Sequence, residues 1–131
     1  MAETRNVTNK YNEMVQDLLT SVPSLKPITE QAVTIIFLES DYRKKTKGKT
    51  VFGVTEKVGS KNKWAIPADF TITIYTQNIQ GFTDKQVKIL LEHELMHVGV
   101  SEDKKMFVKP HDLEDFREII DKYGAYWDKT A

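Results

Sequence analysis

The chain contains no cysteine, and only 6 of its 131 residues are Gly and 4 are Pro. Without cysteine there are no disulfides, thiolate metal sites or cysteine nucleophiles, so a bound metal would need His, Asp or Glu ligands. An excess of one charge is also absent, because 19 Lys and Arg balance 19 Asp and Glu. This balance argues against a protein that coats nucleic acid or another polyanion nonspecifically.

Long hydrophobic runs are missing as well. No stretch reaches the roughly 18 apolar residues that a membrane span requires, and residues 1–10 are polar, unlike a signal peptide. We therefore expect a cytoplasmic protein that has no signal peptide and no contact with a membrane.

The composition is that of an ordinary globular domain, with 40% hydrophobic and 29% charged residues. We expect one domain over residues 1–131. A chain of this length buries about two-thirds of its unfolded surface on folding, so it does not need a metal merely to hold its core together.

Hydrophobic periodicity predicts helices and strands in the order α-β-β-β-α-α. The expected elements are a helix that starts at Asn6 or Thr8 and ends before Pro23, strands at 32–40, 50–58 and 70–75, a helix at 84–98, and a helix after Pro110 that ends at Gly124. Thr83 and Gln86 have the spacing of a capping box at the start of the second helix. Gly99 is expected to end that helix at positive φ.

The two strands at 32–40 and 50–58 should form a hairpin with a long basic tip between them. The strand at 70–75 alternates between apolar and threonine side chains, which favours an antiparallel or mixed sheet. We expect an α+β fold, with a small sheet of about three strands and helices packed on one face of it.

The motif HExxH is formed by His93, Glu94 and His97 within the second predicted helix. Residues i and i+4 of a helix share a face, so both imidazoles can bind one Zn²⁺. Glu94 then lies beside the metal, where it can act as a general base. The competing interpretation is that the two histidines are ordinary helix-surface or hydrogen-bonded residues.

A catalytic zinc needs three protein ligands and one open position. His111 is the best candidate for the third ligand, because it is the one remaining histidine and starts a helix that can pack against the HExxH helix. The oxygen-ligand alternatives are Glu102, Asp103, Asp112 and Asp115. No histidine follows His97 at the metzincin spacing, which excludes that group.

Asp112 and Asp115 are candidates for orienting a metal-bound histidine, because such histidines usually donate their second ring N–H to a carboxylate or carbonyl. Two acidic residues in the first turn of a helix also complement its dipole. Asp115 can do both, and we keep both interpretations for Asp112.

The chemistry expected from these residues is hydrolysis of a peptide or amide bond. Zinc lowers the pKa of its bound water toward about 7 and polarises a carbonyl, while Glu94 takes the proton of the water and passes it to the leaving amine. A further group should stabilise the oxyanion. The candidates are Tyr123, Tyr126, Arg117 and Tyr75.

The most basic segment is 43–49, which contains Arg43, Lys44, Lys45, Lys47 and Lys49. These side chains are candidates for contact with an acidic substrate or with nucleic acid. The simpler interpretation is a solvated hairpin tip.

Four short motifs support a resemblance to a known family: FLES at 37–40, DFTIT at 69–73, LEHELMHVG at 91–99 and HDLEDF at 111–116. On these motifs the chain resembles the putative phage metallopeptidase family, a small zincin-like group from bacteriophages and prophages. The resemblance implies a minimal zinc-dependent peptidase that acts on a peptide or protein in the bacterial host cytoplasm. It also implies one zinc per chain, with His93, His97 and His111 as ligands and Glu94 as base.

The alternative function is a non-catalytic zinc-binding module of phage origin, which serves protein interaction or regulation and contacts nucleic acid through segment 43–49. Glu94 argues against it, because a purely structural zinc has no need of a carboxylate beside an open position. Nothing in the sequence indicates an oligomeric state.

Overall fold

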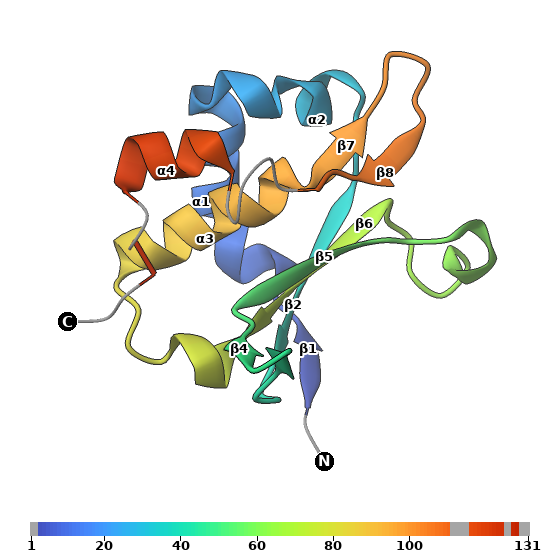
Figure 1. Ribbon diagram of the computed structural model, residues 1–131. Coiled ribbons are helices and arrows are strands. Elements are labelled where there is room, and N and C mark those ends of the chain that lie inside the picture. The colour runs from blue at the N-terminus through green and yellow to red at the C-terminus, as the bar shows by residue number, and fades with distance from the viewer. Residues whose placement is uncertain (1–2, 111–115, 125–126, 129–131) are drawn as a thin grey trace.

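The computed structural model describes residues 3–110, 116–124 and 127–128 (Figure 1). The helical elements are α1 (Thr8–Ser21), η1 (Pro23–Leu25), α2 (Lys26–Glu30), η2 (Ser60–Asn62), η3 (Thr76–Ile79), α3 (Asp84–Met96) and α4 (Arg117–Tyr123). The strands are β1 (Thr4–Asn6), β2 (Ile35–Ser40), β3 (Lys45–Thr46), β4 (Lys49–Thr50), β5 (Gly53–Lys57), β6 (Phe70–Tyr75), β7 (Val98–Val100) and β8 (Met106–Val108). Among these residues, no helix is both long and apolar enough to cross a bilayer.

The main sheet has four strands in the order β1-β2-β6-β5. Strand β6 runs parallel to β2 and antiparallel to β5, so the α+β fold with a mixed sheet is confirmed. The expected hairpin between 32–40 and 50–58 is wrong, because β6 lies between β2 and β5. Phe70, Ile72 and Ile74 of β6 are 0% exposed, so the strand with the most complete apolar face takes a central position.

The basic segment forms a small hairpin of its own, β3 with β4. Its turn consists of Lys47 at φ 51° and Gly48 at φ 77°, the two positive values that a type I′ turn requires. The basic residues are therefore folded locally and do not form a tip that joins two strands of the main sheet.

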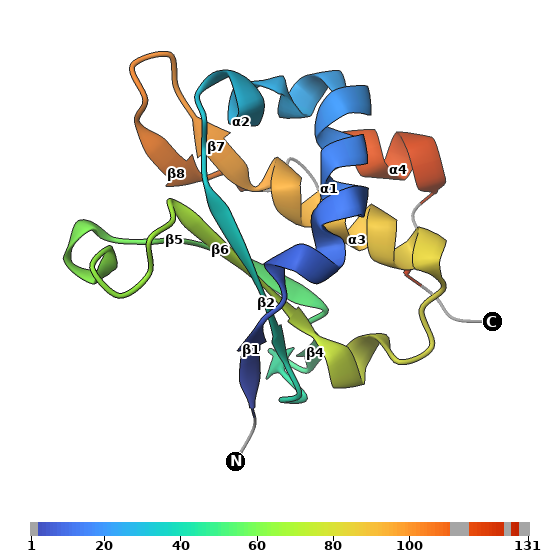
Figure 2. The same cartoon turned by 180° about the vertical axis from the view of Figure 1, so that it is seen from behind.

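Helices α1 and α3 pack on one side of the main sheet and against each other, and α4 packs on α3 (Figures 1 and 2). Helix α1 begins at Thr8, where the Asn6 side-chain oxygen accepts the Thr8 backbone N–H at 3.0 Å. The shared core contains Tyr11, Val15 and Leu18 of α1, Phe37 of β2, the apolar face of β6, and Leu90, Leu91 and Leu95 of α3. Each such side chain contributes about 1.5–3 kcal/mol by burial, and together they hold α3 against the sheet.

Helix α3 starts as predicted and ends differently. The capping box is confirmed, with the Gln86 N–H donating to Thr83 Oγ1 at 3.2 Å and the Thr83 N–H donating to Gln86 Oε1 at 2.8 Å. The predicted end at Gly99 is wrong, because the helix stops at Met96 and Gly99 pairs with Phe107 in the β7–β8 hairpin. A Cβ at Gly99 would lie 2.4 Å from the Phe107 ring, so this glycine provides room for an aromatic side chain.

Helix α4 follows Phe116, whose extended φ of -69° and ψ of 134° make it the N-cap of the helix. Phe116 therefore lies before the first turn of α4, not inside the helix that the sequence predicts from Pro110 to Gly124. The predicted stop is confirmed, since Gly124 ends the helix at φ 82°.

A buried carboxylate joins β1, α1 and β2. Glu39 of β2 is 2% exposed, and it accepts hydrogen bonds from the Tyr11 hydroxyl at 2.6 Å and from Lys10 Nζ at 2.7 Å. Burial alone would raise the pKa of Glu39, but these bonds and the charges of Lys10 and Arg5 outweigh it and hold that pKa below its ordinary value.

Candidate metal centre

The last turn of α3 brings three potential ligands together. One ligand atom from each of His93, Glu94 and His97 lies within 4.8 Å of the other two. The two imidazole centroids are 5.2 Å apart, and His93 Nε2 lies 3.8 Å from Glu94 Oε2. The i, i+4 spacing of the histidines on α3 thus produces the convergence expected for a divalent metal ion.

The His97 ring is oriented by the backbone of Lys109, just after β8. His97 Nδ1 lies 2.6 Å from the Lys109 carbonyl oxygen, and the Lys109 N–H donates to the His97 carbonyl at 2.6 Å. A carbonyl can only accept, so Nδ1 carries a proton, and in the neutral imidazole Nε2 then carries the lone pair. This is the tautomer that a metal ligand requires, held by the kind of contact that usually supports such ligands.

Glu94 is 3% exposed and lies against β5. The Thr55 hydroxyl lies 2.9 Å from Glu94 Oε1 and 2.9 Å from the Glu94 backbone carbonyl, so it links the side chain and the helix end to the sheet. At Gly53, a Cβ would lie 3.2 Å from Glu94 Cγ. A residue without a side chain at position 53 and a hydroxyl at position 55 therefore set the position of this carboxylate.

Aromatic rings pack against the histidine pair. The Phe116 ring centroid lies 5.5 Å from that of His93 and 5.0 Å from that of His97, both in edge arrangements, and Trp127 lies 6.3 Å from His93. Phe116 is 6% exposed. This apolar surface lowers the local dielectric beside the histidines, which strengthens electrostatic interactions there.

Glu92, one residue before His93, connects α3 to α4. It is 0% exposed, and it accepts hydrogen bonds from Lys122 Nζ at 2.7 Å and from the Tyr123 hydroxyl at 2.8 Å. Burial and the bond to Glu92 raise the pKa of Tyr123 to about 12. The Tyr123 hydroxyl would have to leave Glu92 to stabilise an oxyanion, and that role stays a prediction.

Several other predicted site residues lie outside the described part of the chain: His111, Asp112, Asp115 and Tyr126. Arg117 begins α4, and the Tyr75 ring lies 5.8 Å from Lys44 Nζ. Glu102 and Asp103 are exposed in the turn between β7 and β8, and the metal-ligating group found among the described residues does not include them.

Of the basic residues, Arg43, Lys45, Lys47 and Lys49 are exposed, and Lys44 is half-buried. They belong to the β3–β4 hairpin and its approach. Their contact with a substrate or with nucleic acid stays a prediction.

Sequence reasoning missed Lys109, Thr55 and Gly53. Lys109 acts through its backbone carbonyl, which carries no signal in the residue type. Thr55 and Gly53 come close to Glu94 only because β5 packs against α3.

A small α+β domain with two histidines and a carboxylate at one helix end has the donor set of a divalent metal site. The family model described as putative phage metallopeptidase matches residues 5–131, and the chain belongs to this family. The family description suggests a peptidase that uses a divalent metal and acts on a peptide or protein. Comparison with curated proteins and with solved structures finds no match.

Proposed function

We propose that the protein is a zinc-dependent metallopeptidase of the zincin type, with α3 as its HExxH helix. The observation that carries the proposal is the convergence of His93, Glu94 and His97, with His97 held in the ligand tautomer by Lys109. A structural role for the histidines alone would not need the buried carboxylate of Glu94 beside them. Together with the family match, this favours the peptidase over a non-catalytic zinc module.

We assign the third ligand to His111. Two described residues that flank it in the chain, Lys109 and Phe116, both contact His97. The described chain on both sides of residues 111–115 therefore lies beside the proposed centre, which supports this assignment. His97 already has the Lys109 carbonyl as its partner, so Asp112 and Asp115 are our candidates for orienting another ligand histidine.

Zinc held by these residues would supply a Lewis acid that polarises the substrate carbonyl and acidifies water. Glu94 is the general base. Thr55 contacts Oε1, and Oε2 is the oxygen 3.8 Å from His93, so we assign proton transfer to Oε2. Glu94 takes a proton from water as the new C–O bond forms, and gives it to the amine nitrogen as the C–N bond breaks.

The test combines metal analysis with turnover. Protein purified without chelator should contain about one zinc per chain, and His93→Ala and His97→Ala should abolish it, with His111→Ala lowering zinc affinity at least about 10-fold. Glu94→Gln should retain zinc and lose turnover of a broad peptide library, and Glu30→Gln, at an exposed glutamate of α2, serves as the matched control. Equal turnover by Glu94→Gln and wild type would refute the proposal.

Chelation provides a second test. Because burial alone can hold a domain of this size together, the metal-free protein should stay folded and unfold at a lower temperature. Complete unfolding on chelation would instead indicate a structural metal.

A further inference from the structure

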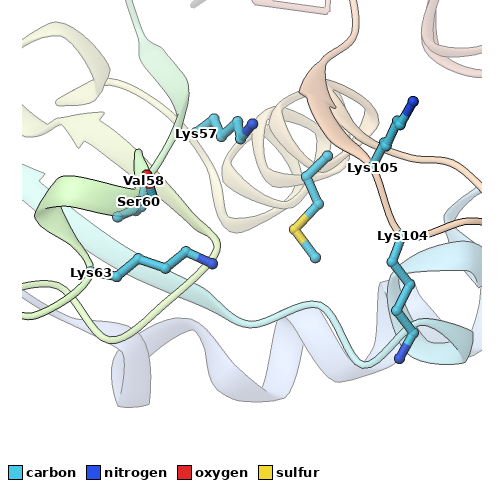
Figure 3. Close-up of a pocket in the computed structure, with 7 residues that line it drawn as sticks. Lys57, Val58, Ser60, Lys63, Lys104 and Lys105 are labelled. Carbon is cyan, nitrogen blue, oxygen red and sulfur yellow. The ribbon is translucent and has the colours of Figure 1, made fainter.

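A pocket of about 500 Å³ lies where β5, the loop after it and the β7–β8 turn meet. Four of its lining residues are lysines, namely Lys57, Lys63, Lys104 and Lys105, and none of the described residues that line it is acidic. Figure 3 shows Lys57 and Lys63 extending toward the segment that carries Lys104 and Lys105. Two segments far apart in the sequence, 57–63 and 104–106, thus contribute lysines to the lining of one pocket, in a chain whose net charge is +0.

Two of these lysines already have acidic partners outside the pocket lining. Lys63 Nζ lies 2.9 Å from Asp69 Oδ1, and Lys105 Nζ lies 3.9 Å from Asp103 Oδ2. Allowing for both pairs, the pocket keeps the charge of Lys57 and Lys104. Lys104 has a φ of 63°, a conformation that glycine and asparagine adopt more readily, yet a lysine occupies it.

The pocket is close to the candidate metal centre along two paths. Lys57 is two residues after Thr55 on β5, so both side chains point to the same face of the strand, and Thr55 contacts Glu94. The β7–β8 hairpin bears Lys104 and Lys105 and leads directly to Lys109, whose carbonyl orients His97. An extended peptide advances about 3.3 Å per residue, so a chain that passes Glu94 reaches the pocket within a few residues.

We propose that this lysine pocket binds acidic side chains of the peptide substrate, so that the enzyme prefers peptides with Asp or Glu a few residues from the cleaved bond. The inference rests on the proposed peptidase function and specifies its substrate class. The lysine charges suit carboxylates. Val58 and Met106 in the lining provide apolar contact for the methylene groups of a glutamate side chain.

The shape of the pocket favours a peptide over nucleic acid. It is a single pocket with room for a few side chains, whereas nucleic acid is tracked by an extended basic groove with stacking aromatic residues. Trp64 is 87% exposed and follows Lys63 in the chain, but it does not line the pocket. The experiment therefore includes an oligonucleotide.

The binding experiment uses zinc-loaded Glu94→Gln protein, which should not cleave its ligand. Fluorescence anisotropy compares a labelled peptide rich in Asp and Glu with the same peptide carrying Asn and Gln. We expect the acidic peptide to bind about tenfold more tightly, and the preference to shrink at high salt. Lys57→Gln combined with Lys104→Asn should remove the preference and leave the affinity for the neutral peptide unchanged.

The matched control is Lys26→Gln with Lys85→Gln, two exposed helix lysines outside the pocket, which should leave the preference intact. Equal affinity for the two peptides would overturn the proposal. The proposal would also be overturned if Lys45→Gln combined with Lys47→Asn, in the β3–β4 hairpin, removed the preference while the pocket variant retained it. Tighter binding of a single-stranded oligonucleotide, lost in the pocket variant, would also overturn it in favour of a nucleic-acid site.

The two proposals can fail separately. If the acidic peptide binds as expected but wild-type protein cleaves no peptide, the peptidase function fails and the anion pocket stands. If wild-type protein cleaves acidic and neutral peptides with equal kcat/KM, the peptidase stands and the lysine pocket fails as a substrate site.

Discussion

Gly53→Ala tests the position of Glu94 most directly. The new Cβ would lie 3.2 Å from Glu94 Cγ, 3.3 Å from Glu94 Cδ and 3.2 Å from the Thr73 carbonyl oxygen. The carbonyl belongs to β6 at the centre of the sheet and cannot easily move. The Glu94 side chain must therefore give way by a few tenths of an ångström.

The magnitudes follow from this crowding. A misplacement of about 1 Å at a catalytic group costs about 100-fold in rate, so a few tenths should slow turnover by about 3- to 10-fold. Overpacking costs about 1–3 kcal/mol, and the loss of glycine flexibility in the unfolded chain offsets about 0.4–1 kcal/mol of it. We expect a net loss of about 1 kcal/mol in the free energy of unfolding, with zinc content unchanged.

Gly59→Ala is the control. A Cβ there meets nothing within 4 Å, and its φ of -68° suits alanine. Urea unfolding and the turnover rate on a cleaved library peptide should separate the two variants, and zinc analysis should find the same content in both. If Gly53→Ala matches Gly59→Ala in both stability and rate, Glu94 does not lie against β5 and the assignment of the base loses its support.

Three further substitutions test contacts in the site and the core. Thr55→Val retains the side-chain shape and removes the hydroxyl that contacts Glu94, so turnover should slow about tenfold and stability should fall by about 1–2 kcal/mol, with zinc content unchanged. Glu39→Gln should lower the free energy of unfolding by about 2 kcal/mol at neutral pH, because it removes the buried negative charge that Lys10 and Arg5 pair with. Because the folded-state pKa of Glu39 is lowered from 4.5, its stabilisation is present above that pH and is lost as the pH falls through the folded-state value. The unfolding free energies of variant and wild type, measured in urea at decreasing pH below 4.5, should therefore converge. Tyr123→Phe should lower the free energy of unfolding by about 1–2 kcal/mol, because it removes one hydrogen-bond partner of buried Glu92. If the variant instead keeps its stability and its turnover slows by about two orders of magnitude, Tyr123 stabilises the oxyanion.

The elements that sequence analysis predicted well depend on neighbouring residues. The strand Phe70–Tyr75 follows from alternation of side chains, and the start of α3 follows from Thr83 and Gln86, which satisfy each other's backbone groups. The i, i+4 spacing of His93 and His97 similarly required only a helix. The prediction for Gly99 was wrong because glycine is suited both to a helix end and to a position beneath an aromatic ring. The residue that distinguishes the two roles is Phe107, which lies on the opposite strand of the hairpin and is not a sequence neighbour of Gly99.

The sequence alone determined the α+β class and the two imidazoles on one helix face, because both depend on short-range periodicity. Only the tertiary structure decided that β6 separates β2 from β5, that the Lys109 carbonyl orients His97, and that Gly53 and Thr55 position Glu94. The lysine pocket also belongs to this second group, since its walls come from β5, its following loop and the β7–β8 turn. Burial of the apolar core brings these distant segments together, and no local pattern encodes which of them will meet.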